Sequence, residues 1–123
     1  MSLQISIRQS ADVTILELSG KATMEGDSDK LDRRLKELVA NGVRNLLLNL
    51  EGLSQVDSSG IAIIIKAYVC LRDYGGELRL VCPCGRVLDV LTLFRLPEII
   101  PSFDDETQAL ASFRPEQSYA ANP

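Results

Sequence analysis

The sequence predicts a single α/β domain built on one mixed β-sheet. A chain of 123 residues is the usual size of one domain, and its 46% hydrophobic and 24% charged residues are typical of a folded protein. Stretches with the period of a strand alternate with stretches that have the period of a helix. We expect the order ββαβαβαβα within residues 1–113, with most helices on one face of the sheet.

The first half of the chain predicts a hairpin followed by a helix. Residues 3–9 and 13–20 alternate apolar and polar side chains, which favours two antiparallel strands that each bury one face. Apolar residues then recur at helical spacing, at positions 31, 35, 38 and 39. Asp27 or Ser28 is expected to cap this helix, and Asn41-Gly42 to end it.

The second half continues the alternation. The continuous apolar run at 45–50 predicts a central strand, and a strand at 77–81 should lie parallel to it after a helical crossover. The other expected elements are helices at 61–71, 86–94 and 104–113, with an edge strand at 98–103 that contains Pro101. Residues 114–123 have no apolar period and are predicted to form a flexible tail.

Missing chemistry argues against an enzyme. The chain has no histidine, the usual base for a serine or cysteine nucleophile and a common metal ligand. It contains no Gly-x-Ser-x-Gly, no Gly-x-Gly-x-x-Gly and no complete phosphate loop, because Ala22 follows Lys21. Three cysteines without a C-x-x-C pair favour neither a metal site nor a disulfide framework. We therefore expect no catalytic residues, metal or cofactor.

Charge and hydropathy argue against nucleic acid and membranes as binding partners. A net charge of −4 without a basic cluster works against direct binding of nucleic acid. No apolar run approaches the ~20 residues that a membrane helix needs, and the first residues lack the pattern of a signal peptide. A cytoplasmic protein that contacts no membrane is the expectation.

The segment Asp57-Ser58-Ser59-Gly60 stands directly before the apolar helix. Asp and Ser are favoured helix caps, so capping alone could explain these residues. The helix is apolar almost all the way round, with Lys66 as its lone charge, and a small chain has few elements to enclose it. This second observation favours a docking surface with a hydroxyl group at its tip that can be modified.

Residues 45–68 and 74–83 resemble the STAS domain of anti-sigma factor antagonists. The most specific part is an apolar strand, seven intervening residues that end in Asp, then Ser-Ser-Gly and an apolar helix. The resemblance extends from about residue 3 to 113 in the order of its elements, and it implies the STAS fold.

The resemblance also implies a partner-switching function. An unmodified antagonist binds an anti-sigma factor and thereby frees a sigma factor; the anti-sigma factor is a kinase that phosphorylates the serine after the aspartate, and a serine phosphatase reverses this. Carried onto this chain, the acceptor is Ser58. Asp57, Ser59 and Gly60 shape the recognised loop, and Ile61 begins the contacting helix, on which Lys66 is a further expected contact.

The sequence departs from the family at residues 20–24, Gly-Lys-Ala-Thr-Met, where many members have Gly-x-Leu-Asp. This loop is expected near the serine, so its change bears on partner identity. Ala62 stands where many relatives have a second glycine. Two other interpretations remain open: an accessory subunit of a transporter or signalling assembly without a kinase cycle, and an enzyme of unknown type.

Overall fold

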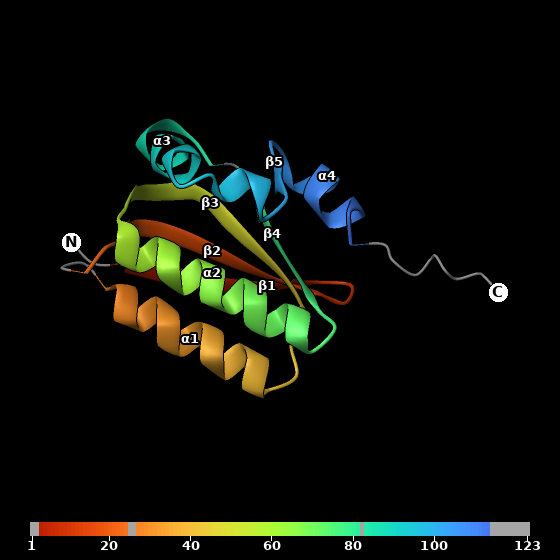
Figure 1. Cartoon of the computed structure of the whole chain (residues 1–123). Coiled ribbons are helices and arrows are strands. Elements are labelled where there is room, and N and C mark those ends of the chain that lie inside the picture. Colours follow the sequence, from red (N-terminus) through yellow and green to blue (C-terminus); the bar gives the residue numbers. More distant parts are fainter. Residues whose placement is uncertain (1–2, 25–26, 82, 114–123) are drawn as a thin grey trace.

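The computed structural model describes residues 3–24, 27–81 and 83–113 (Figure 1). The predicted flexible tail at 114–123, and Cys82 of the Cys-Pro-Cys segment, lie outside these described residues. Within the described ranges, no helix is both long and apolar enough to cross a membrane.

The strands form one mixed sheet. Its order is β1 (Leu3–Ser10), β2 (Val13–Ala22), β3 (Asn45–Val56), β4 (Glu77–Val81) and β5 (Ser102–Phe103). Strand β1 pairs with β2 in the antiparallel direction, whereas every later pairing is parallel. The predicted hairpin, the mixed sheet and the parallel central strands are therefore confirmed.

The helices cover the two faces of the sheet unequally. Helices α1 (Ser28–Ala40), α2 (Ser58–Asp73) and α3 (Gly85–Leu93) contribute to one large core, while α4 (Glu106–Ala111) packs with a smaller core on the opposite face. Strand β3 shows this division, because its Leu46, Leu48 and Leu50 enter the large core and Leu47 enters the small one. The expected order of elements and the expected majority of helices on one face are confirmed.

Glycine ends both long helices, as the sequence predicts. Gly42 has φ of 98°, and the next residue, Val43, donates its N–H to the Leu38 carbonyl at 3.0 Å. Gly75 has φ of 83°, and Gly76 likewise donates to Leu71 at 2.7 Å. These are the bonds of a Schellman motif, which requires the left-handed conformation that glycine adopts without strain.

Two predicted strand boundaries were wrong. Strand β3 runs on to Val56 instead of ending at residue 50, because its pairing with β2 continues past two irregularities in register. The predicted strand at 98–103 shrinks to Ser102–Phe103 after a 3-10 turn at Leu96–Glu98. The turn forms because it buries Leu96 and Ile100 completely, which an extended edge strand could not do for both.

The helix starts also differ from expectation. Helix α2 begins at Ser58 rather than at residue 61, and α4 is shorter than the predicted 104–113. Asp27 occupies the cap position of α1, but its side chain makes no capping bond and instead accepts the N–H of Leu3 at 3.3 Å. That bond joins the start of β1 to the start of α1, a tertiary contact that local sequence rules do not foresee.

Replacing Leu48 by alanine tests whether β3 is the centre of the fold. Leu48 is fully buried in the large core, so the variant should lose about 2–5 kcal/mol of unfolding free energy in urea denaturation. Leu93→Ala is the matched control, because that side chain is 79% exposed and its loss should cost less than about 0.5 kcal/mol. Equal losses in the two variants would contradict this arrangement of the core.

Candidate functional site

Asp57 joins the start of α2 to the loop that follows β2. One carboxylate oxygen, Oδ1, accepts the backbone N–H groups of Ser59 at 3.0 Å and Gly60 at 3.2 Å and also the Ser59 hydroxyl. The other oxygen, Oδ2, accepts the backbone N–H of Met24 at 3.0 Å. The residue is therefore a helix cap, and it also holds the loop at residues 20–24 against the helix start.

The same contacts determine the charge of Asp57. Its partial burial favours the neutral form, but hydrogen bonds from the Ser59 hydroxyl and from the backbone N–H groups of Met24, Gly60 and Ser59 outweigh that effect. Together they hold the pKa of the Asp57 carboxyl below its ordinary value. Asp57 is thus a carboxylate at neutral pH, directly before the candidate acceptor.

The two serines differ in what their hydroxyl groups contact. The Ser59 hydroxyl donates to Asp57, and its side chain is half-buried. Ser58, the first residue of α2, is exposed, and its hydroxyl makes no hydrogen bond with any described residue. Of the pair, Ser58 is the hydroxyl that an approaching protein could reach and modify.

Gly60 is required by the close approach of α2 to strand β2. A Cβ atom at this position would overlap the carbonyl oxygen of Ala22 and would lie 2.8 Å from Cγ2 of Val56. Ala22 and Val56 are themselves neighbours across the β2–β3 pairing. Helix α2 can therefore begin at this edge of the sheet only with glycine at position 60.

The other predicted contact residues have different surroundings. Ile61 is only 2% exposed and lies within the large core, so any contribution to partner binding is indirect, through the position of the helix. Lys66 is exposed, and its ammonium group lies 3.2 Å from Asp32 of α1. It therefore belongs to the flank of α2 that faces α1, away from the tip that carries Ser58.

Met24 belongs to the site although the sequence analysis did not select it. Its side chain is 77% exposed, while its backbone is held by Asp57. The departure from the family pattern at residues 20–24 pointed to this loop, and the expectation that the loop lies near the serine is confirmed. An exposed methionine beside Ser58 is a flexible apolar contact for a partner.

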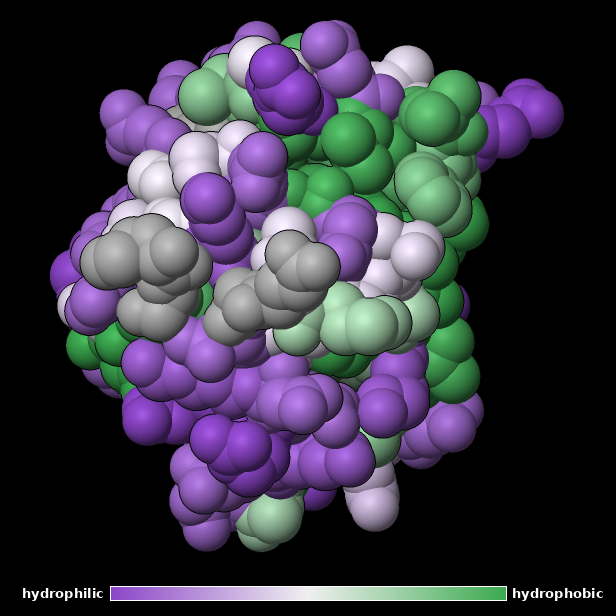
Figure 2. All heavy atoms as spheres, turned by 90° about the vertical axis from the view of Figure 1, so that its left-hand side faces the viewer, coloured by the Kyte–Doolittle hydropathy of each residue, from purple (hydrophilic) through white to green (hydrophobic). Residues whose placement is uncertain are grey.

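The surface near the helix start divides by hydropathy. Figure 2 shows hydrophobic residues gathered at the upper right, whereas the upper left and most of the lower part are hydrophilic. Helix α3 and the following residues carry exposed large apolar side chains, namely Leu88, Leu93, Phe94 and Ile99. A group of exposed apolar side chains is typical of surfaces that bind other proteins.

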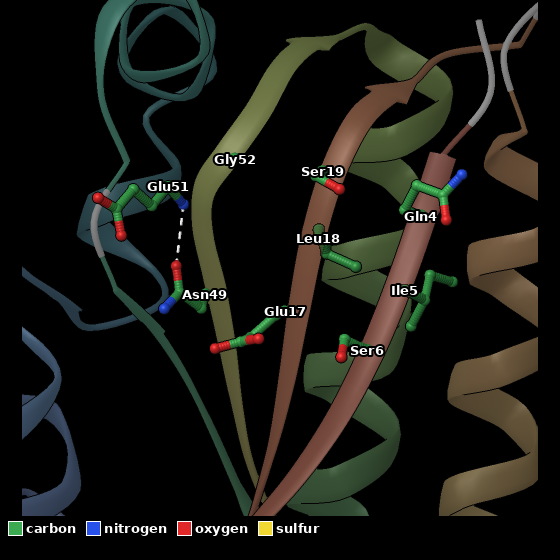
Figure 3. A pocket seen from close by; sticks show the side chains of 9 residues that line it. All are labelled: Gln4, Ile5, Ser6, Glu17, Leu18, Ser19, Asn49, Glu51 and Gly52. Atoms are coloured by element: carbon green, nitrogen blue, oxygen red, sulfur yellow. Dashed lines mark hydrogen bonds between the residues drawn. The ribbon is translucent and has the colours of Figure 1, made fainter.

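A polar hollow lies on the other side of the sheet (Figure 3). Side chains of β1, β2 and β3 line it, among them Gln4, Glu17 and Asn49. Asn49 accepts the backbone N–H of Glu51 at 2.9 Å, and Glu17 pairs with Arg8 at 2.8 Å. None of the residues selected from the sequence lines this hollow.

Replacing Gly60 by alanine should force α2 away from β2. We expect a loss of about 1–3 kcal/mol in unfolding free energy, because the new methyl group meets backbone that cannot give way. Ser58→Ala is the control at the same helix start, since its side chain is exposed. Urea denaturation of both variants would measure the difference, and a Gly60→Ala protein as stable as the parent would contradict the packing described.

The pH dependence of Asp57→Ala tests the capping carboxylate. At pH 7 the variant should be about 0.5–2 kcal/mol less stable than the parent. The folded-state pKa is lowered below the unfolded value of about 3.9, so this stabilisation is complete above the unfolded pKa. As the pH falls through the folded pKa, the difference between parent and variant should shrink. A difference that stays constant into strong acid would refute the role of the charge.

Comparisons with known proteins identify the family of this chain. The sequence matches the STAS domain family over residues 4–109. It is 33% identical over 115 residues to the anti-sigma F factor antagonist of Paenibacillus polymyxa. The matched region covers 89% of this chain and 94% of that relative.

Solved structures show the same fold. An anti-sigma factor antagonist from Mycobacterium paratuberculosis superposes with a TM-score of 0.85 at 19% identity, covering 93% of this chain and 96% of that one. The anti-sigma factor antagonist SpoIIAA in its unphosphorylated form superposes with a TM-score of 0.67 at 19% identity. The match covers 90% of this chain and 96% of that one. These structural likenesses bear on the fold, and the sequence matches bear on ancestry. By the match of the family model and the 33% identical relative, the chain belongs to the STAS domain family.

Proposed function

We propose that this protein is an anti-sigma factor antagonist that acts by partner switching. In its unmodified form it would bind an anti-sigma factor in the cytoplasm and so free a sigma factor. Phosphorylation of Ser58 by that partner, acting as a serine kinase, would break the complex, and a serine phosphatase would restore it. The relative named an anti-sigma F factor antagonist supports the class of function. The observation that carries the site is the exposed Ser58 hydroxyl beside the engaged Ser59 hydroxyl.

The switch follows from the placement of charge. A phosphoserine carries roughly −1.5 to −2 charges, and at position 58 it would stand beside the Asp57 carboxylate. The N-terminal end of α2 favours negative charge, so the domain should stay folded. The nearby N–H groups of Ser59 and Gly60 already donate to Asp57, so the phosphate would keep much of its hydration. A partner that covers the tip would have to remove that water from a multiply charged group, which opposes binding.

The surface available to the partner has two parts around Ser58. Met24 stands beside the helix start, held by Asp57, and the exposed apolar residues of α3 extend the hydrophobic area. Asp57, Ser59, Gly60 and Ile61 would maintain the shape of this surface, and Lys66 would contribute at its margin. The loop at 20–24, whose residues depart from the family pattern, would then influence which anti-sigma factor is bound.

The alternative function is that of an accessory STAS subunit without a kinase cycle. Part of a murine anion transporter, Slc26a9, has this fold, with a TM-score of 0.70 and a cover of 18% of that chain. Affinity purification from the native cytoplasm separates the two functions. An anti-sigma kinase among the bound proteins supports partner switching, whereas a transporter that binds equally well to the parent and the Ser58→Asp protein supports the alternative.

Substitutions of Ser58 test the charge mechanism. Ser58→Ala should bind the anti-sigma partner whether or not ATP is present, because the neutral surface cannot be modified. Ser58→Asp should fold like the parent but bind at least tenfold more weakly, as measured by calorimetric titration. Ser6→Asp is the matched control, since it adds the same charge to an exposed position on β1. Equal affinities of the alanine and aspartate variants at Ser58 would contradict the charge mechanism. They would mean that Asp57-Ser58-Ser59-Gly60 serves only as a helix cap.

Mapping the phosphate tests the choice between the two serines. Incubation with the cognate kinase and ATP should add one phosphate, which peptide mass spectrometry should locate at Ser58. Ser58→Ala should abolish the reaction. Ser59→Ala should still be phosphorylated, although more slowly, because the Asp57 cap loses one donor. A phosphate found only on Ser59 would overturn the assignment.

A further inference from the structure

A groove between α1 and α2 is a second candidate site, separate from Ser58. The two helices lie side by side on the large core, and the hollow between them has a volume of about 420 Å³ (Figure 1). Sites for small molecules span roughly 300–1,000 Å³, so the groove is large enough for a ligand. It exists because α2 presents small side chains toward α1, namely Ala67 and Cys70.

The middle of the groove is apolar. Its lining there includes Leu35 and Val39 from α1 and Ile63 and Ala67 from α2. Tyr74 lines the groove near the end at which both helices finish, and the residue is 60% exposed. Leu35 and Ala67 are already buried, whereas Val39 and Ile63 are half-buried, so an elongated hydrocarbon segment would remove mainly the remaining exposed surface of Val39 and Ile63 from water.

Basic side chains border the apolar lining. Lys36, Lys66 and Arg44 line the groove, against the single acid Asp32, so the groove is positive in a chain whose net charge is −4. Asp32 holds both lysines together, at 3.1 Å from Lys36 and 3.2 Å from Lys66. An ammonium group has three donors, so each lysine retains hydrogen-bonding capacity beyond its bond to Asp32.

The basic side chains of the groove are not equivalent. Arg44 uses its Nη1 for the carbonyl groups of Val39 and Val43, and its guanidinium lies 4.6 Å from the centre of the Tyr74 ring. The lysine side chains are more available, with 67% and 59% exposure. An anionic head group is therefore better bound by Lys36 and Lys66, through the donors that Asp32 leaves free, than by Arg44, and its apolar chain would then run along the groove toward Tyr74.

We propose that the groove between α1 and α2 binds a single-chain anionic amphiphile, a carboxylate with an unbranched hydrocarbon chain. Charge complementarity at the lysines would select the head group, and the apolar lining would hold the chain. This inference does not rest on the proposed function, because Lys66 is the one residue of the proposed partner surface that lines the groove, and neither Ser58 nor the other residues around the α2 start do.

Titration with decanoate below its micelle-forming concentration tests the proposal. Amide resonances of α1 and α2 along the groove should shift and saturate, whereas the resonances of residues 57–60 should change little. Decyltrimethylammonium, which has the same chain and the opposite charge, should bind at least fivefold more weakly. Shifts confined to other surfaces, no saturable binding, or equal affinity for the two probes would each overturn the proposal.

A charge-matched pair of variants locates the head group. Lys36→Gln/Lys66→Gln should weaken decanoate binding about three- to tenfold, the effect expected of two partly exposed ion pairs. Arg33→Gln/Arg34→Gln removes the same number of charges from α1 residues that do not line the groove, and it should bind like the parent. Circular dichroism would verify that both fold. Equal weakening in both pairs would mean that only net charge matters and would refute the site.

Two further measurements distinguish the proposed groove from a membrane-binding surface and from the partner surface of the proposed function. Binding to anionic phospholipid vesicles without binding of monomeric decanoate would identify a membrane-binding surface and would contradict the proposal. The same lysine variants can be titrated against the anti-sigma partner. If decanoate fails to bind while the Ser58 variants behave as a switch, the groove proposal falls and the proposed function stands.

Discussion

The Asp57 carboxylate is the interaction on which the geometry of the candidate site depends. Strands β2 and β3 are parallel, so both end at the same edge of the sheet, with Ala22 opposite Val56. A long backbone bond, from the N–H of Asp57 to the carbonyl of Ala22 at 3.4 Å, joins the two chain segments that leave this edge. Asp57 divides its two oxygens between them, one for the first turn of α2 and one for Met24. The Asp57 carboxylate therefore caps the helix, anchors the loop and supplies the local negative charge.

In this arrangement, the residues that build the helix start differ from the residue whose side chain is exposed to solvent. Ser59 is engaged with Asp57, Gly60 is in contact with β2, and Ile61 is in the core. Ser58 alone in this segment is exposed. A modification of its hydroxyl therefore changes the surface without removing a contact on which folding depends, which is what a reversible switch requires.

Helix α2 has surfaces of three kinds, and this explains why it is so apolar. One side enters the large core, a second side faces α1 across the groove, and Val69 remains 51% exposed. The sequence analysis expected incomplete enclosure of this helix, and the exposure of Val69 agrees. Part of its hydrophobic surface is nevertheless explained by α1 and the groove, so the proposed docking surface near Ser58 would depend more on Met24 and α3 than on α2.

Local patterns determined much of this protein. The alternation at 3–9 and 13–20, the apolar run at 45–50 and the glycines after both long helices are governed by neighbours in sequence, and their predicted structures were confirmed. The segment at 57–60 likewise predicted a helix cap, because capping is a local interaction, although the helix begins at Ser58 and not at residue 61.

Contacts between distant residues decided the rest. Local rules could not show that Asp27 binds Leu3, that Leu96 and Ile100 turn inward, or that Lys66 pairs with Asp32. Nor could they show which of two adjacent serines is engaged, since the answer depends on how the Asp57 oxygens are shared with Met24. The sequence by itself determined the order of the elements and the position of the candidate acceptor. The tertiary structure alone decided its exposure, its neighbours and the groove, because these arise where segments far apart in the chain pack together.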